Sequence, residues 1–97
     1  MDLNKLKKFY KNKKVFITGN TGFKGIWLQL FLIHCGAKVQ GYSLRIKKND
    51  DFLFYKKIKK ECKRINTTYG NVLNYSFLQK TIKNFKPDIV FHFAAQS

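Results

Sequence analysis

A cluster of three glycines between two apolar segments constrains this chain of 97 residues more than any other feature. The segment before the cluster, 13–18, is short, β-branched and aromatic, which is typical of a buried strand. The segment after it, 23–35, has apolar side chains at helical spacing and stops at Gly36, a common helix terminator. The sequence therefore predicts a strand, a tight turn over residues 19–22 and a helix that follows at once.

The turn reads Thr-Gly-Asn-Thr-Gly-Phe-Lys-Gly over residues 18–25. The first turn of a helix carries N–H groups without partners and a partial positive charge, so it attracts phosphate groups. Glycine is needed where the backbone turns sharply, approaches the anion or packs closely on the strand, and a side chain at Gly22 would occupy the space of the phosphate. The spacing is G-x-x-G-x-x-G rather than G-x-G-x-x-G. The place of the glycines between strand and helix is therefore what predicts a site for the pyrophosphate of a dinucleotide.

The remaining segments continue the alternation of strands and helices. We predict a short amphipathic lead-in helix within residues 1–12, further helices over 52–63 and after Asn74, and strands over 37–43, 64–69 and 88–93. Such alternation implies right-handed crossovers and a parallel sheet. The expected fold class is α/β, a Rossmann-like parallel sheet of about four strands in the order 3-2-1-4, with residues 13–97 forming part of a dinucleotide-binding domain.

Several side chains are expected to be structural. Phe23, Trp27, Leu30 and Phe31 share one face of the helix over 23–35, so we expect that helix to be largely buried and its aromatic residues to belong to the core. Structural roles are also expected for His34, at the end of this helix, and for His92, inside a buried strand. Cys35 and Cys62 form no metal-type pair, so the sequence predicts no metal site and a reduced, cytoplasmic protein.

The formal net charge of +15 raises the question of an anionic partner. Nearly all of the cations are lysines scattered through every segment, whereas proteins that read bases rely on arginine forks. This pattern favours a solvated lysine-rich surface and makes a nucleic-acid partner the less favoured interpretation. A small basic nucleic-acid-binding module remains the alternative of a different class. No segment approaches the roughly 18 apolar residues of a membrane span, so no membrane association is expected.

The acidic residue that usually binds the adenosine ribose, about 20 residues beyond the glycines, is missing. That place holds Ser43, Leu44 and Arg45, and Asp50 and Asp51 come too late in the chain. Arg45 either pairs with a 2′-phosphate, which would favour NADP, or is one more surface cation. These residues by themselves leave the choice between NAD and NADP open.

The pattern Thr-Gly-x-x-Gly-Phe-x-Gly between strand and helix resembles that of the extended short-chain dehydrogenase/reductase family. Within this family, residues 19–28, which read GNTGFKGIWL, closely resemble the N-terminal motif of the CDP-glucose 4,6-dehydratases. Further similar stretches are residues 41–44, 70–72 and 86–96, at the ends of the second and third expected strands and along the fourth. The resemblance covers nearly the whole chain.

The resemblance implies which residues surround the cofactor. Asn71 stands where the family usually has aspartate, so an acceptor for the adenine amino group is kept but its charge is lost. The subfamily tolerates the missing acidic ribose ligand, which favours NAD. The implied set comprises Gly19, Thr21, Gly22, Phe23 and Lys24 around the pyrophosphate, Gly25 where the helix meets the sheet, Ser43 and Arg45 beside the ribose, Asn71 and Val72 beside adenine, and Phe93, Ala94 and Ala95 along the cofactor.

The resemblance also implies an activity for the intact enzyme. NAD takes hydride from C4 of the sugar of CDP-glucose, water is lost across C5 and C6, and the hydride returns to C6. The product, CDP-4-keto-6-deoxyglucose, serves surface-glycan synthesis. A GDP-mannose 4,6-dehydratase, which the ending over residues 94–97 would suit, or a sugar-nucleotide epimerase is the alternative within the family. The nucleotide sugar is thus the expected partner, and the intact family usually forms homodimers.

The family's catalytic Tyr-x-x-x-Lys follows the fourth strand, and no such motif stands there in these 97 residues. Two matches by letter, Tyr10 with Lys14 and Tyr55 with Lys59, lie before the required place and are expected by chance in so lysine-rich a chain. We therefore expect the N-terminal, NAD-binding portion of a dehydratase, without catalytic residues and inactive alone. Its fourth strand would expose an apolar edge that is prone to association.

Overall fold

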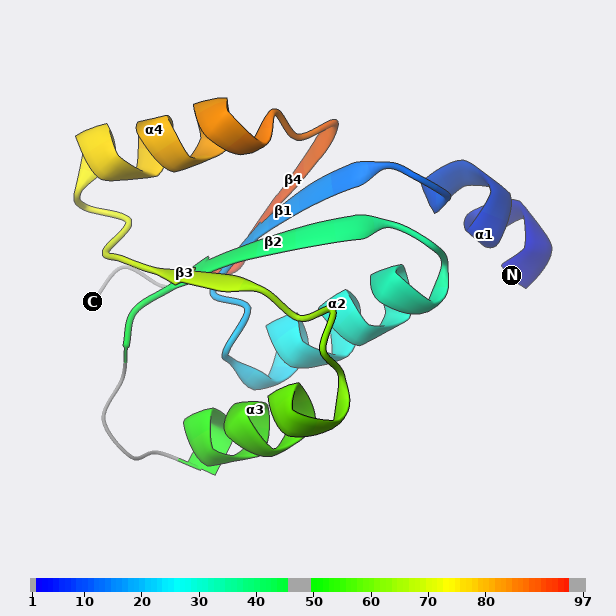
Figure 1. The fold of residues 1–97 in the computed structure, drawn as a ribbon, viewed down its shortest axis with the longest axis horizontal. Coiled ribbons are helices and arrows are strands. Elements are labelled where there is room, and N and C mark those ends of the chain that lie inside the picture. Colours follow the sequence, from blue (N-terminus) through cyan, green and yellow to red (C-terminus); the bar gives the residue numbers. More distant parts are fainter. Residues whose placement is uncertain (1, 46–49, 95–97) are drawn as a thin grey trace.

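The computed structural model describes residues 2–45 and 50–94 and contains a four-stranded parallel sheet with helices on both of its faces (Figure 1). Its strands run in the order β3-β2-β1-β4, and all neighbouring pairs are parallel. The bounds of the strands are β1 (Lys14–Thr18), β2 (Lys38–Ser43), β3 (Thr67–Tyr69) and β4 (Ile89–His92). The predicted fold class and strand order are confirmed.

The helices connect these strands and lie in two layers. In Figure 1, α2 and α3 cover one face of the sheet and α4 covers the other, while α1 lies at the N-terminal end. Their bounds are α1 (Leu3–Tyr10), α2 (Phe23–His34), α3 (Asp50–Glu61) and α4 (Tyr75–Phe85). Because every connection returns across a helix, the carboxyl ends of the four strands meet at one edge of the sheet.

The central strand β1 is buried almost throughout because it has a neighbour on each side and helices above and below. Val15 stands opposite Val39 of β2 and Ile89 of β4 in the register of the sheet. Val15, Phe16 and Ile17 are fully buried, which explains why this strand reads as a continuous apolar run rather than an alternating one.

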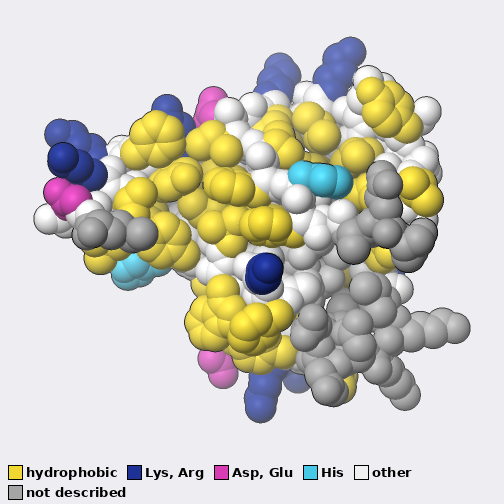
Figure 2. Space-filling model, turned by 180° about the vertical axis from the view of Figure 1, so that it is seen from behind, with side chains coloured by type: hydrophobic (Ala, Val, Ile, Leu, Met, Phe, Trp, Pro, Cys, Tyr) yellow, Lys and Arg dark blue, Asp and Glu magenta, His cyan; other side chains and the backbone are white. Residues whose placement is uncertain are grey.

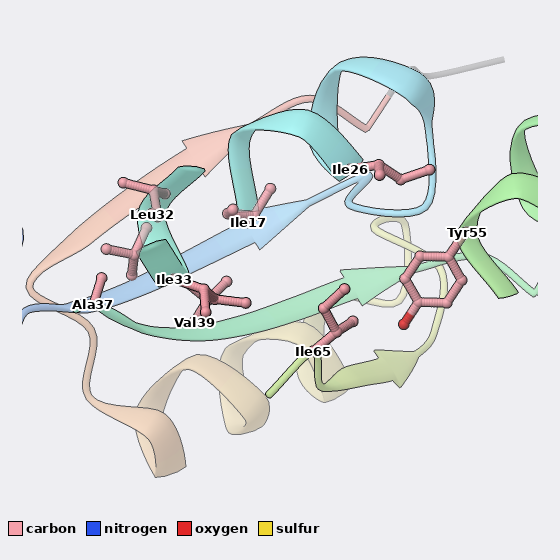
Figure 3. Close-up of a cluster of buried hydrophobic side chains, with 9 residues drawn as sticks. Ile17, Ile26, Leu32, Ile33, Ala37, Val39, Tyr55 and Ile65 are labelled. Atoms are coloured by element: carbon pink, nitrogen blue, oxygen red, sulfur yellow. The ribbon is translucent and has the colours of Figure 1, made fainter. Parts of the chain in front are cut away.

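The hydrophobic core fills the space between the sheet and the layer of α2 and α3 (Figure 3). Ile26, Leu32 and Ile33 of α2 pack there with Ile17 of β1, and Tyr55 of α3 closes the core near Ile65. A separate aromatic contact on the other face joins the rings of Phe16 and Phe85, whose centroids are 6.3 Å apart. The helices on both faces are thus anchored by apolar contacts.

The prediction that the aromatic face of α2 is buried was wrong for Phe23 and Trp27, whereas Leu30 and Phe31 are half-buried against the core. Phe23 and Trp27 are 56% and 53% exposed, while the inward face carries Ile26 and Gln29 instead. The two aromatic rings lie 6.2 Å apart and each contacts the ring of Phe54 on α3, at 6.3 and 6.1 Å between centroids. The sequence pattern did not reveal that α3 would cover only part of this side of α2.

The third strand is shorter than the predicted range of 64–69. The chain still turns before the strand begins, since Ile65 N–H donates to the Cys62 carbonyl and the Ile65 side chain enters the core. The Asn66 carbonyl then accepts a 2.8 Å hydrogen bond from the N–H of Gly41 on β2. Only from Thr67 onward does the backbone adopt regular strand pairing.

The fourth strand forms an edge of the described sheet. Val90 is 49% exposed and His92 is also exposed, so the expectation that His92 lies inside a buried strand was wrong. Figure 1 shows the strands one behind another with β4 farthest away, and Figure 2 views the molecule from that side and shows hydrophobic side chains gathered across it. The expected apolar edge is present.

Among the described residues, no helix is both long enough and apolar enough to cross a membrane.

Candidate functional site

The glycine turn begins with Gly19, which connects three strands at their carboxyl ends. Its φ of +74° lies in the left-handed region, where a side chain is strained. Its N–H donates a 2.9 Å hydrogen bond to the carbonyl of Tyr42 on β2. A Cβ atom here would stand 2.8 Å from the nitrogen of Ala94, just after β4. Glycine is therefore required both by the backbone conformation and by the close approach of the neighbouring chain.

Gly22 opens the helix α2 and leaves room in front of it. It is the N-cap residue, with φ −77° and ψ 165°, and no described side chain caps this helix start. A Cβ atom at Gly22 would meet only the Gly19 carbonyl oxygen, at 3.4 Å, an ordinary contact. Phe23 and Lys24 follow, and both are exposed. The positive end of α2 is thus open to an anion, and a lysine stands beside it.

Gly25 differs from Gly22 in its surroundings. Gly25 packs against the backbone of the turn, whereas Gly22 borders open space. A Cβ atom on Gly25 would be 2.5 Å from the Gly19 oxygen and 2.7 Å from the Cα of Asn20. Both of these are backbone atoms and cannot move away without moving the turn. The close packing of α2 on the glycine turn therefore depends on this residue.

Two buried amides, Asn20 and Gln29, hold the turn to the helix. Gln29 Nε2 donates a 2.8 Å hydrogen bond to the Asn20 carbonyl, and Asn20 Nδ2 donates to Gln29 Oε1 at 3.2 Å. Asn20 Nδ2 also donates to Thr67 Oγ1 of β3 at 2.7 Å, and both amide residues are fully buried. Sequence reasoning missed this pair, although Gln29 as the single polar residue within the apolar run 26–33 was the available signal.

The side chain of Asn20 lies in space that glycine leaves free on β2. A Cβ atom at Gly41 would overlap the Asn20 side-chain amide. Thr67 Oγ1, which accepts from Asn20, also bonds to the hydroxyl of Tyr55 on α3. Burial raises the pKa of the Tyr55 hydroxyl above its ordinary value of 10.0. The turn, strand β3 and the helices α2 and α3 are therefore joined through one buried polar network.

The end of β2 is placed beside the turn by a hydroxyl contact. Thr21 Oγ1 lies 2.7 Å from Ser43 Oγ, and both side chains are buried. The Ser43 carbonyl accepts a 2.9 Å hydrogen bond from Gly70 N–H, which brings in the end of β3. Arg45 is exposed, and its guanidinium lies over the ring of Tyr69 with Cζ 4.9 Å from the centroid. The structure thus brings Thr21 and Ser43 together and leaves Arg45 at the rim.

Asn71 and Val72 follow β3 at the same edge of the sheet. The Asn71 carbonyl accepts a 2.9 Å hydrogen bond from the Tyr42 hydroxyl, whose pKa is raised by burial. The Asn71 side-chain oxygen accepts from Leu73 N–H at 2.9 Å, which fixes a local turn. Asn71 is exposed and Val72 is half-buried, so both are accessible from this edge.

The end of β4 is fastened to the end of β1 by Thr18. The Thr18 carbonyl accepts from Phe93 N–H at 3.0 Å, and its hydroxyl accepts from Ala94 N–H at 3.2 Å. The same hydroxyl lies 2.6 Å from His92 Nδ1, which gives that histidine a structural partner. Phe93 is 43% exposed next to the turn. Ala95, also expected at this site, lies outside the described residues.

The tyrosines of the two chance Tyr-x-x-x-Lys matches have structural positions. Tyr10 belongs to α1, and Tyr55 of α3 is fully buried with its hydroxyl bonded to Thr67. Cys35 and Cys62 are both free thiols. The edge brings together the open start of α2, the small residues of the glycine turn and the hydroxyls of Thr21 and Ser43, an arrangement suited to holding an extended anionic ligand.

Comparison with known proteins shows which protein family and which individual proteins this chain resembles in sequence. Residues 16–97 match the protein-family model described as GDP-mannose 4,6 dehydratase. The CDP-glucose 4,6-dehydratase of Salmonella typhimurium is 40% identical over 94 residues, which cover 93% of this chain and 24% of that protein. The chain thus spans about a quarter of the length of this curated relative.

Solved structures with the same fold include two that are also similar in sequence. WbmH of Bordetella bronchiseptica, in complex with NAD+, is 28% identical with a TM-score of 0.70, over 89% of this chain and 27% of that one. The epimerase Mth375 of Methanothermobacter thermautotrophicus is 25% identical with a TM-score of 0.70, over 97% of this chain and 26% of that one. In both comparisons the present chain matches about a quarter of the longer protein.

Proposed function

This chain belongs to the GDP-mannose 4,6 dehydratase family of extended short-chain dehydrogenases/reductases, and we propose that it supplies the NAD-binding part of a nucleotide-sugar 4,6-dehydratase. The single observation that carries the proposal is the open start of α2, where Gly22 leaves room for a phosphate and no described side chain caps the helix. A pyrophosphate placed there would accept hydrogen bonds from the first N–H groups of the helix and would face the positive end of the helix dipole.

Within this proposal each part of the edge has its own task. Gly22, Phe23 and Lys24 bind the pyrophosphate, whereas Gly19 and Gly25 give the turn its shape. Thr21 orients Ser43 through their 2.7 Å contact. The further residues follow the strand ends: Ser43 and Arg45 stand beside the ribose, Asn71 and Val72 beside adenine, and Phe93, Ala94 and Ala95 along the remainder of the cofactor.

We favour NAD over NADP for this site. No carboxylate among the described residues stands at the end of β2, so the ribose would be held by Ser43 and by backbone groups. The Arg45 guanidinium already lies over the Tyr69 ring. In the alternative, Arg45 pairs with a 2′-phosphate through its in-plane N–H groups, which stay available while its face lies over the ring, and selects NADP. A preference for NADP that disappears in Arg45→Ala would favour this alternative.

The proposed reaction of the whole enzyme is the conversion of CDP-glucose to CDP-4-keto-6-deoxyglucose. When bound, the cofactor supplies the hydride chemistry, and the residues of this chain hold and orient it. The choice of CDP-glucose rests on the motif at residues 19–28 and on the 40% identity to a CDP-glucose 4,6-dehydratase. GDP-mannose is the alternative substrate, favoured by the matching family model. We further propose a cytoplasmic enzyme that forms homodimers and uses the nucleotide sugar as its partner.

The experiment that tests the proposal measures the thermal stability of the 97-residue chain with and without NAD. We expect NAD to raise Tm in a concentration-dependent manner, because it binds only the folded chain. Gly22→Val should abolish this protection while costing about 1 kcal/mol or less in stability, since its Cβ would meet only the Gly19 carbonyl oxygen, at 3.4 Å. Lys80→Ala, an exposed change on α4, serves as the control and should keep the protection. Equal protection of wild type and Gly22→Val would contradict the proposal.

A further inference from the structure

His92 lies on the edge strand β4, beside the threonine that ends the central strand β1. It stands opposite Thr18 in the parallel register of the two strands, and its Nδ1 lies 2.6 Å from Thr18 Oγ1. His92 is exposed, whereas Thr18 is only 2% exposed. The pair therefore joins a solvent-accessible ring to a buried hydroxyl at the carboxyl end of β1.

The Thr18 hydroxyl has a second partner, which determines the direction of its bond to His92. Ala94 N–H donates to Thr18 Oγ1 at 3.2 Å, so the oxygen is an acceptor there. Among the described residues, this hydroxyl has no partner other than Ala94 and His92. If His92 Nδ1–H donated as well, the buried hydroxyl proton would have no acceptor, which is unfavourable. The hydroxyl proton therefore points to Nδ1, and the neutral ring carries its own proton on Nε2.

The position of the hydroxyl proton decides how well the oxygen holds Ala94. A threonine hydroxyl rotates about its Cβ–Oγ1 bond unless an acceptor holds its proton. While His92 accepts this proton, the lone pairs of Thr18 Oγ1 stay available to Ala94 N–H. Without that acceptor, the proton turns for part of the time toward Ala94 N–H and repels it.

The backbone around Ala94 lies directly against the glycine turn. A Cβ atom at Gly19 would stand 2.8 Å from the Ala94 nitrogen and 2.9 Å from the carbonyl carbon of Phe93. The Gly19 carbonyl in turn accepts a 3.1 Å hydrogen bond from Gly22 N–H, at the start of α2. A shift of the backbone at Ala94 therefore changes the surroundings of Gly19 and, through it, the position of Gly22.

We infer that His92 is a positioning residue of the NAD site. It acts through Thr18, by holding the hydroxyl proton away from Ala94 N–H, and so keeps the end of β4 against the glycine turn. No contact between the ring and the cofactor is needed. The inference rests on the proposed binding of NAD at Gly22 and extends that site to a residue outside the expected cofactor-binding set.

The first test is isothermal titration calorimetry of the 97-residue chain with NAD. His92→Leu removes the acceptor and should weaken NAD binding by about fivefold, the effect of one hydrogen bond. His92→Asn has a similar size and places its Oδ1 where Nδ1 stands, so the affinity should return to within about twofold of the wild type. His34→Leu, at the exposed end of α2, is the matched control and should leave the affinity unchanged. Circular dichroism verifies that each variant is folded.

A double-mutant cycle separates this role from a general loss of stability. Thr18→Val keeps the shape of the side chain but removes the hydroxyl, so it should weaken NAD binding at least as much as His92→Leu. The double variant Thr18→Val, His92→Leu should bind NAD as well as Thr18→Val alone, because His92 has no effect once the hydroxyl is gone.

NMR tests the hydrogen-bond arrangement without NAD. In the isotope-labelled chain at mildly alkaline pH, long-range N–H correlations should show the His92 proton on Nε2. Three results would overturn the inference: a proton on Nδ1, equal NAD affinities of His92→Leu and the wild type, or additive effects of Thr18→Val and His92→Leu. A wild type that does not bind NAD would contradict the proposed function as well, whereas these three results leave that function standing.

Discussion

Gln29 shows how one residue fixes the shape of the candidate site without reaching its surface. Its amide bonds in both directions with Asn20, in the middle of the glycine turn, and neither residue is exposed. Removing one partner of a buried hydrogen bond leaves the other without compensation, which costs more than the bond itself contributes.

We therefore predict that Gln29→Leu, which keeps the volume but removes the amide, lowers the free energy of unfolding by about 2–4 kcal/mol. The measurement is urea denaturation followed by circular dichroism. The exposed residue Gln79 on α4 provides the control, and Gln79→Leu should change the free energy of unfolding by less than about 0.5 kcal/mol. Similar values for the two variants would show that the buried amide pair does not hold the turn.

The glycines of the turn differ in what surrounds them, and their substitutions should differ accordingly. We predict that Gly25→Ala destabilises the fold by at least about 2 kcal/mol, because its Cβ would stand 2.5 Å from the Gly19 carbonyl oxygen. Gly22→Ala should cost about 1 kcal/mol or less, because its nearest neighbour is at 3.4 Å. Urea denaturation of both variants gives the comparison, and the reverse order of the two costs would contradict this account of the turn.

At the scale of elements, α3 is tied to the sheet by Tyr55. Its hydroxyl bonds to Thr67 of β3, and burial raises its pKa above the ordinary value of 10.0. A raised pKa means that folding favours the neutral hydroxyl. This contribution is fully present below pH about 10 and is lost as pH rises through the pKa of the folded state.

We accordingly predict that Tm falls as the pH rises above about 10, and that Tyr55→Phe makes this fall less steep. The measurement is a series of thermal denaturation curves from neutral to alkaline pH. Tyr75, which is 68% exposed on α4, provides the control as Tyr75→Phe. An unchanged slope in Tyr55→Phe would mean that the burial of this hydroxyl does not govern the alkaline loss of stability.

The helices and strands also show which structural features could be predicted from the local sequence. Helix α4 begins after Asn74, as the sequence predicted, and the Asn74 side-chain oxygen accepts from Phe77 N–H at 3.3 Å; the helix ends at Phe85, two residues before Pro87. Local signals sufficed there because a cap and a proline act within their own segment. The exposed face of α2 and the short β3 depend on how α3 packs, which no local pattern contains.

For the candidate site, the sequence predicted the position of the glycine turn but not the side-chain contacts that hold it. The order of strand, glycine turn and helix indicated where a phosphate would lie, since that geometry follows from the backbone alone. The pairing of Asn20 with Gln29, and the space at Gly41 that accommodates Asn20, were not predictable. They arise where residues of the turn, of α2 and of β2 meet, which happens only in the folded chain.

At the scale of the whole molecule, the two edges of the sheet have opposite characters. Edge strand β3 lies near the exposed Lys59 and Lys60 of α3, whose positive charges oppose close approach of another chain. Edge strand β4 reads Ile-Val-Phe-His and is flanked by the exposed ring of Phe93. An uncharged apolar edge strand offers unpaired backbone groups to any neighbouring chain.

We predict that the 97-residue chain associates through β4 in a concentration-dependent manner. Val90→Lys, at a position that is 49% exposed, should shift the population toward the monomer because a charge on an edge strand opposes pairing. Sedimentation velocity at several concentrations measures this shift. Thr68→Lys, on the opposite edge, is the control that should leave association unchanged. Association that is insensitive to Val90→Lys would assign it to another surface.

The proposed binding of NAD at the glycine turn is tested most directly by amide NMR of the isotope-labelled chain during titration with NAD. The account predicts the largest shifts at the amides of Gly22, Phe23, Lys24 and Gly25, and smaller shifts at Ser43 and Asn71. It also predicts that Gly22→Val removes all of these shifts while the remainder of the spectrum is retained. No change at the amides of residues 22–25, or changes confined to α3, would contradict it.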